Sequence, residues 1–190
     1  MNKSFRIALF ASGSGTNAER FFQYFKNHKH IEITLLLSNN PQAYALKRAE
    51  KAGVPARVFD RTQLKNGEVL NWLQSQRITH IVLAGFLWLI PDNLILAFPE
   101  KIVNIHPALL PKFGGKGMYG GKVHEAVKAA GDMETGITIH LVNEHYDEGA
   151  ILKQAKIAIE PTDTPEQIAE KVHQLEYQYY PSAVEDWIMK

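Results

Sequence analysis

The chain has 190 residues, 45% of them hydrophobic and 22% charged, which is typical of one globular domain with a sizeable core. The net charge of +1 gives no reason to expect binding to nucleic acid or to an anionic membrane, and the lack of cysteine excludes disulfides and cysteine nucleophiles. Since no apolar run is long enough for a membrane span or a signal peptide, we expect a cytoplasmic protein with a single domain over residues 1–190.

The first 90 residues alternate between strand and helix patterns. Strands are expected at residues 5–11, 31–37, 54–59 and 81–86, and helices after the loop 12–17, over 40–51 and near 68–76. Asn40 and Pro41 supply an N-cap and a first-turn proline for the second helix. This alternation predicts an α/β fold with a doubly wound, mostly parallel sheet and helices on both faces.

The pattern changes after residue 100. We expect a strand at 101–105, a loop with five glycines at 113–121, a helix at 122–130, and strands at 135–142 and 151–159. Thr164 and Gln167, with a proline between them, predict the start of a last helix that runs towards Tyr180. Pro181 is expected to kink or interrupt that helix.

Two polar residues end the strand near residue 105. Alternate residues of a strand share a face, so Asn104 and His106 should point the same way, and Pro107 stops the strand directly after them. Ligands of open α/β sheets bind at the carboxyl ends of strands. The alternative is an ordinary strand end with two polar residues facing water.

The first loop places Gly13, Gly15 and Ala18 in a G-x-G-x-x-A pattern between a strand and a helix. Backbone N–H groups at a helix start bind phosphate, and glycine permits a close approach. A dinucleotide site also needs an acidic residue at the end of the second strand, where the chain has Ser38-Asn39-Asn40. We therefore expect a phosphomonoester at this loop, with a purely structural glycine turn as the alternative.

Other polar residues carry weaker signals. Asp147 lies in a polar loop, where an aspartate commonly binds its own backbone. His140 fits an ordinary hydrogen-bonded histidine of a sheet, and His124 and His145 are expected on the surface. No spacing of histidine and acidic residues resembles a metal site.

Four motifs occur together and in order. They are Ser12-Gly13-Ser14-Gly15-Thr16-Asn17, Leu83-Ala84-Gly85-Phe86, Asn104-Ile105-His106-Pro107-Ala108-Leu109-Leu110-Pro111 and Asp147-Glu148-Gly149. The set resembles the folate-dependent formyltransferases, which have a Rossmann-like fold, over essentially the whole chain. The early glycine loop points to the branch of that family that uses glycinamide ribonucleotide.

The resemblance implies transfer of the formyl group of 10-formyltetrahydrofolate to the amine of glycinamide ribonucleotide, in de novo purine biosynthesis. The family's catalytic residues correspond to Asn104, His106 and Asp147. Asn104 and a protonated His106 would stabilise the oxyanion, and Asp147 would raise the pKa of His106. Neither a metal nor a nucleotide cofactor is then required, and the protein is expected as a monomer or homodimer.

The resemblance also implies binding residues. The substrate phosphate and ribose correspond to Gly15, Thr16, Asn17, His173 and Glu176, although Glu176 on its own suggests an exposed helix charge. The folate residues are Leu87, Trp88, Leu89, Ile90, Asn104, Asn143, Glu144, His145, Tyr146 and Asp147. A cis Leu110–Pro111 bond is implied as well. The resemblance assigns no ligand contacts to the loop 113–121, which is longer than in many relatives. It also assigns no folate contacts to residues 60–67, where the correspondence with the family is ambiguous.

Three alternatives remain. A formyltetrahydrofolate deformylase carries an additional N-terminal domain, for which the first strand at Phe5 is expected to leave no room. A methionyl-tRNA formyltransferase adds a C-terminal domain, whereas this chain ends at Lys190 and is nearly neutral. A phosphate-binding module without chemistry would have no need of Asn104, His106 and Asp147 together.

Overall fold

The structure is a computed structural model, and it describes residues 4–190. Its strands are β1 (Phe5–Phe10), β2 (Ile31–Ser38), β3 (Ala56–Val58), β4 (His80–Leu83), β5 (Ile102–His106), β6 (Glu134–Leu141) and β7 (Ile151–Ala158). Its helices are α1 (Thr16–Phe25), α2 (Tyr44–Ala52), α3 (Arg61–Lys65), α4 (Glu68–Ser75), α5 (Asp92–Ala97), α6 (Gly121–Ala130) and α7 (Pro165–Met189). The strands follow the order β3-β2-β1-β4-β5-β6-β7 in a mostly parallel sheet, which confirms the predicted fold class.

The chain forms two compact units, one that ends at Val103 and one from Asn104 to Lys190. Each unit is described by itself. The single domain expected from chain length stays a prediction.

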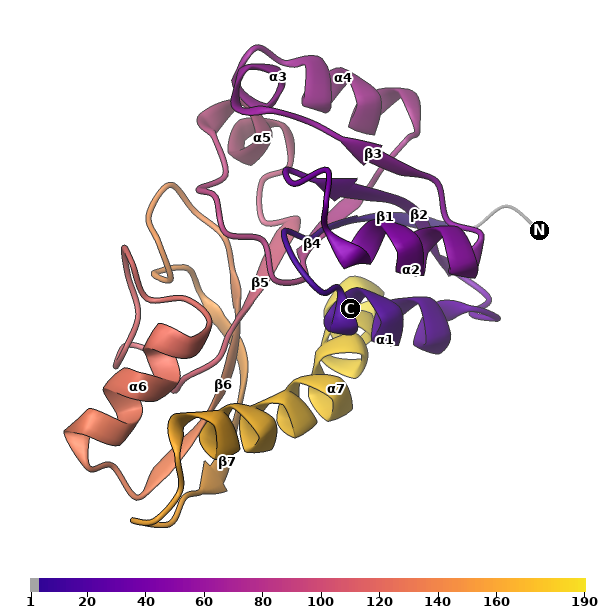
Figure 1. Ribbon diagram of the computed structural model, residues 1–190. Coiled ribbons are helices and arrows are strands. Elements are labelled where there is room, and N and C mark those ends of the chain that lie inside the picture. The colour runs from indigo at the N-terminus through magenta and orange to yellow at the C-terminus, as the bar shows by residue number, and fades with distance from the viewer. Residues whose placement is uncertain (1–3) are drawn as a thin grey trace. The chain divides into compact units, whose positions relative to one another are not determined.

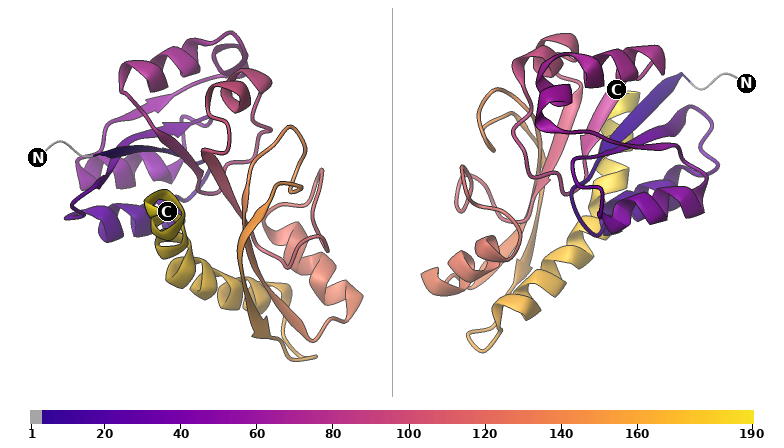
Figure 2. Two further views of the ribbon diagram at one scale, coloured as in Figure 1. Left: turned by 180° about the vertical axis from the view of Figure 1, so that it is seen from behind. Right: turned by 45° about the horizontal axis from the view of Figure 1, so that its top comes forward.

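The first unit contains the parallel strands β3-β2-β1-β4, and β4 bonds to the residue before β5, where Ile81 N donates to Lys101 O at 2.9 Å. Helices α1 and α2 lie on one face of these strands, and α3, α4 and α5 lie on the other (Figures 1 and 2). Because both faces are covered, the central strands are mostly apolar, and Phe10, Leu36 and Val82 are fully buried.

One local prediction for this unit is wrong, and two short helices were not predicted. The second helix begins at Tyr44, because Asn40 forms a turn in which its Oδ1 accepts Gln42 N at 2.9 Å and its carbonyl accepts Ala43 N at 3.1 Å. Helix α3 was not predicted, although Asp60 and Gln63 form a capping box at its start. The short helix α5 was also missed.

The second unit contains the end of β5, the antiparallel pair β6–β7, and helices α6 and α7. Helix α7 packs against both strands and against α6. Its own residues Val172 and Val184 are completely buried. Thr164 and Gln167 form the predicted capping box. Pro181 does not interrupt the helix, which continues to Met189 with an axis that bends along its length (Figure 2).

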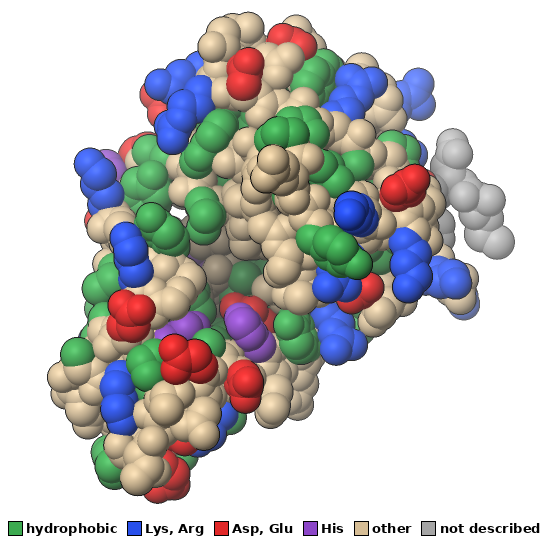
Figure 3. Space-filling view, in the orientation of Figure 1, with side chains coloured by type: hydrophobic (Ala, Val, Ile, Leu, Met, Phe, Trp, Pro, Cys, Tyr) green, Lys and Arg blue, Asp and Glu red, His purple; other side chains and the backbone are tan. Residues whose placement is uncertain are grey.

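The Leu110–Pro111 bond is cis, as the resemblance implied. On the face drawn in Figure 3, basic and acidic side chains are interspersed, in keeping with the net charge of +1. Of the helices within residues 4–190, none is both long and apolar enough to cross a membrane.

Candidate active site

Four polar side chains of the second unit lie together at the end of β5. Asn104 Nδ2 is 3.2 Å from His140 Nε2, and His106 Nδ1 is 3.4 Å from Asp147 Oδ2. His140 Nε2 is also 3.6 Å from Asp147 Oδ1, so the carboxylate lies between the two imidazoles. We call these four residues the polar cluster. The structure thus brings together Asn104, His106 and Asp147, the three residues that the sequence predicted as catalytic.

Backbone geometry places Asp147 in the cluster. Its φ of 59° is left-handed, which is uncommon for a residue other than glycine. Gly115 N donates to Asp147 Oδ2 at 2.9 Å and so orients the carboxylate. At Gly149, an added Cβ would lie 1.7 Å from the carbonyl oxygen of Leu141, so only glycine fits this close turn.

The second ring nitrogen of His106 contacts the glycine-rich loop. His106 Nε2 lies 2.8 Å from the carbonyl oxygen of Phe113, and a carbonyl only accepts, so Nε2 carries a hydrogen. Phe113 adopts a left-handed φ of 57°. The loop therefore occupies the hydrogen-bonding position of His106 Nε2.

The pKa of His106 is lowered from its ordinary value of 6.5, because burial disfavours the charged ring. Asp147 and the Phe113 carbonyl oppose this effect, but burial prevails. The predicted effect of Asp147, which is to raise the pKa of His106, is present, but burial outweighs it and the net shift is downward. The imidazole is neutral in the free protein at neutral pH.

The pKa of Asp147 is lowered as well. Burial alone would raise it, but the neighbouring His140 and His106 rings and the Gly115 N–H outweigh burial. The cluster therefore holds an ionised carboxylate beside a neutral imidazole.

His140 was missed as a site residue. Its Nδ1 donates to the carbonyl oxygen of Leu141 at 2.8 Å, so a neutral ring presents Nε2 as an acceptor to the Asn104 amide. This bond fixes which end of the Asn104 carboxamide carries the N–H groups. The sequence did carry a signal, because His140 shares a face of β6 with Thr138 and lies near the carboxyl end of that strand.

The glycine loop of the first unit leads directly into α1. Gly15 is the N-cap with a left-handed φ of 73°, and within the described residues no side chain caps the helix. The first N–H groups of a helix lack intrahelical acceptors. Thr16 and Asn17, both predicted to bind phosphate, occupy this first turn.

The predicted folate segment 87–90 also belongs to the first unit. Leu87 and Leu89 are exposed, whereas Ile90 is buried. Trp88 contacts the rings of Phe86 and Phe59, and the Arg61 guanidinium lies 4.3 Å from its ring centroid. Trp88 is therefore part of an aromatic cluster.

The remaining folate segment, Asn143–Tyr146, forms a turn of the second unit. Asn143 Oδ1 accepts His145 N at 3.0 Å, which is an Asx turn. Glu144, His145 and Tyr146 are exposed, as expected for His145.

The two substrate residues predicted in the last helix lie on α7 of the second unit. Glu176 is only 6% exposed, which contradicts the reading of an ordinary solvent-facing charge. His173 is exposed, and its ring lies 6.5 Å from that of His124. His124 is buried, not on the surface as expected, and burial together with His173 and His106 lowers its pKa to about 4.

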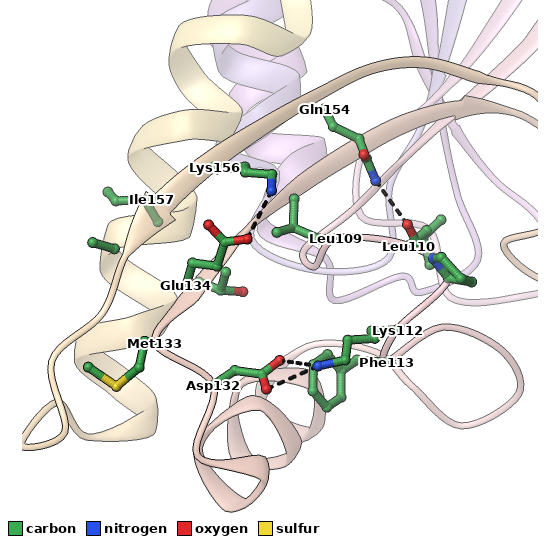
Figure 4. A pocket seen from close by; sticks show the side chains of 13 residues that line it. Leu109, Leu110, Lys112, Phe113, Asp132, Met133, Glu134, Gln154, Lys156 and Ile157 are labelled. Carbon is green, nitrogen blue, oxygen red and sulfur yellow. Dashed lines mark hydrogen bonds and ion pairs between the residues drawn. The ribbon is translucent and has the colours of Figure 1, made fainter.

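Figure 4 shows a separate pocket of about 740 Å³ in the second unit, between residues 109–113 and the β6–β7 pair. Its charged side chains form two ion pairs, Lys112–Asp132 at 2.8 Å and Lys156–Glu134 at 2.9 Å. None of the site residues predicted from the sequence is among the residues that line it. We assign this pocket no part in the chemistry. Over the described part of the chain, no group of three or more His, Asp or Glu residues could hold a metal ion.

Comparison with known proteins gives consistent results. The family model described as formyl transferase matches residues 5–184. Phosphoribosylglycinamide formyltransferase from Haemophilus influenzae is 37% identical over 94% of the chain and 85% of its own length. The enzyme of the same name from Bacillus subtilis is 36% identical over 94% of the chain and 92% of its own length. The chloroplastic enzyme of Arabidopsis thaliana is 39% identical over 94% of the chain, which spans only 64% of that relative.

Solved structures of proteins with these names are also similar to this chain. Phosphoribosylglycinamide formyltransferase from Bacillus halodurans has a TM-score of 0.88 at 35% identity and covers 97% of this chain and 96% of its own. Glycinamide ribonucleotide transformylase 1 from Geobacillus kaustophilus has a TM-score of 0.86 at 36% identity, with coverages of 95% and 96%. The resemblance seen in the four sequence motifs is confirmed: the chain belongs to the formyl transferase family.

Proposed function

We propose that the protein transfers the formyl group of 10-formyltetrahydrofolate to the amine of glycinamide ribonucleotide, which gives formylglycinamide ribonucleotide. The polar cluster carries this proposal, because it combines an oriented amide donor with a neutral imidazole and an ionised carboxylate. The name shared by the relatives, phosphoribosylglycinamide formyltransferase, supports the choice of acceptor.

The amide of Asn104 suits the oxyanion. Attack of the amine on the formyl carbon turns the carbonyl oxygen into an oxyanion, which preorganised N–H donors stabilise. One N–H of Asn104 is directed to His140 Nε2 at 3.2 Å. The second N–H of the same amide group can donate to the formyl oxygen, and its direction is set by the first bond.

His106 and Asp147 suit the proton transfers. The attacking amine loses a proton, and the departing folate nitrogen gains one. A neutral imidazole accepts the first proton and, as an imidazolium, delivers the second. Asp147, whose Oδ2 lies 3.4 Å from His106 Nδ1, stabilises the imidazolium between the two steps. Once Nε2 no longer donates to the Phe113 carbonyl, the neutral ring can carry its hydrogen on Nδ1, directed to Asp147 Oδ2, and Nε2 then accepts the amine proton.

The binding residues follow the same proposal. The start of α1, with Gly15, Thr16 and Asn17, binds the substrate phosphate through backbone N–H groups. His173 and the buried Glu176 bind the ribose part. On the donor side, exposed Leu87 and Leu89 with Trp88 and Ile90 contact the pterin, and so do Asn104 and the turn 143–147.

A turnover assay tests the proposal. Purified protein should release tetrahydrofolate from 10-formyltetrahydrofolate only when glycinamide ribonucleotide is present, and mass spectrometry should detect the formylated amine. Equal release in water alone would replace the transferase with the deformylase alternative. Binding of the ribonucleotide with no release under either condition would leave a phosphate-binding module.

A further inference from the structure

Three consecutive carbonyl groups of the glycine loop accept hydrogen bonds from one neighbouring segment of the first unit, residues 40–48. The pairs are Asn40 Nδ2 to Ser12 O at 3.3 Å, Ala45 N to Gly13 O at 3.1 Å, and Arg48 Nε to Ser14 O at 2.9 Å. All three carbonyl oxygens are thus directed towards α2 and its preceding turn.

This arrangement matters for an anion site. Carbonyl oxygens repel a phosphate, whereas backbone N–H groups attract it, so a phosphate loop needs its carbonyls fixed elsewhere. Gly15 lets the loop pack tightly against α2, because an added Cβ would lie 2.5 Å from the Cβ of Ala45. The segment 40–48 therefore acts as the scaffold of the loop.

Arg48 makes the most informative of these contacts. Its Nε donates to the carbonyl of Ser14, and its Nη1 forms an ion pair with Glu19 in the first turn of α1. The guanidinium also lies 5.0 Å from the ring centroid of Tyr44, and its side chain is only 22% exposed. One planar group therefore links the loop to the helix that follows it.

We propose that Arg48 is a positioning residue for the phosphate of the substrate. It holds the Ser14 carbonyl away from the anion and so directs the N–H groups of Gly15, Thr16 and Asn17 towards it. Glu19 balances its charge, so Arg48 acts through geometry and not through net attraction. The inference rests on the proposed function, in which this loop binds phosphate.

Arg48→Lys tests the inference, since it keeps the charge and removes the planar fork. We expect KM for glycinamide ribonucleotide to rise about tenfold, because the lost bonds involve a charged group. The inhibition constant of inorganic phosphate should rise by a similar factor. Since the residue acts on binding alone, kcat should change by less than about twofold, and the KM for 10-formyltetrahydrofolate should stay the same.

Lys47→Ala is the matched control, because Lys47 is exposed, carries the same charge on the adjacent position of α2 and lies 5.7 Å from the same Tyr44 ring. It should leave both constants unchanged, and thermal melting should show that both variants fold. A wild-type phosphate inhibition constant in Arg48→Lys, or an equal rise in both variants, overturns the inference. Failure of the proposed function is distinguishable, because the wild type would then form no formylated amine while phosphate binding by calorimetry still compares the variants.

Discussion

His106 Nδ1 lies 3.4 Å from Asp147 Oδ2, and only 4% and 10% of the two side chains are exposed. A carboxylate at this distance stabilises an imidazolium. The burial of the ring destabilises the imidazolium by more than Asp147 stabilises it, so the pKa of His106 is lowered. In the free protein, the pair therefore consists of a neutral His106 and an ionised Asp147. It becomes an ion pair only when His106 accepts a proton, which is the event that the proposed reaction requires.

The pH dependence follows from this balance. If neutral His106 is the base, kcat/KM should fall on the acid side with an apparent pKa below 6.5, the ordinary value of histidine. Asp147→Asn removes a cause that raises the pKa of His106, so the acid limb should move to still lower pH. A pH–rate profile of both proteins measures this. An acid limb above 6.5 in the wild type would contradict the lowered pKa of His106, and a fall in kcat/KM on the alkaline side would show that the residue acts as an imidazolium.

His106→Ala should lower turnover severely, because both proton transfers lose their carrier. General acid–base catalysis contributes about 10²–10⁴-fold, which sets the expected loss in kcat. Fluorescence titration should show that folate binding largely survives, because the ring contacts Asp147 and Phe113 inside the protein. His30→Ala, which removes an exposed histidine of the first unit, is the control and should keep full activity. Near-normal kcat in His106→Ala would remove the residue from the mechanism.

A double-mutant cycle tests whether His140 acts through Asn104. Asn104→Ala should lower kcat by about 10²–10³, the usual effect of a lost oxyanion donor. His140→Ala should lower kcat by a smaller factor, because the amide remains but its orientation is no longer fixed. In the Asn104→Ala background the His140 substitution should then have little further effect. Additive losses would mean that His140 contributes independently of Asn104.

The sequence predicted the strands and long helices well, because period-2 and period-3.6 patterns report which faces are buried. It missed α3 and α5, which are too short to show a period, and misplaced the start of α2, where Asn40 makes a turn before the helix. The residues of the polar cluster were found through motifs, apart from His140. The net pKa shift of His106 depends on burial, which spacing along the chain does not report.

Two glycines of the second unit should respond oppositely to alanine. Gly136 lies in β6, where an added Cβ would be 2.0 Å from the carbonyl oxygen of Ala155 on the paired strand. Because backbone would have to shift, Gly136→Ala should lower the free energy of unfolding by about 1–3 kcal/mol. Gly121 begins α6 in open space, and alanine there should raise that free energy by up to about 1 kcal/mol through helix propensity. Urea denaturation of the two variants measures both changes. Equal stability of Gly136→Ala and the wild type would mean that the β6–β7 pair can separate without cost.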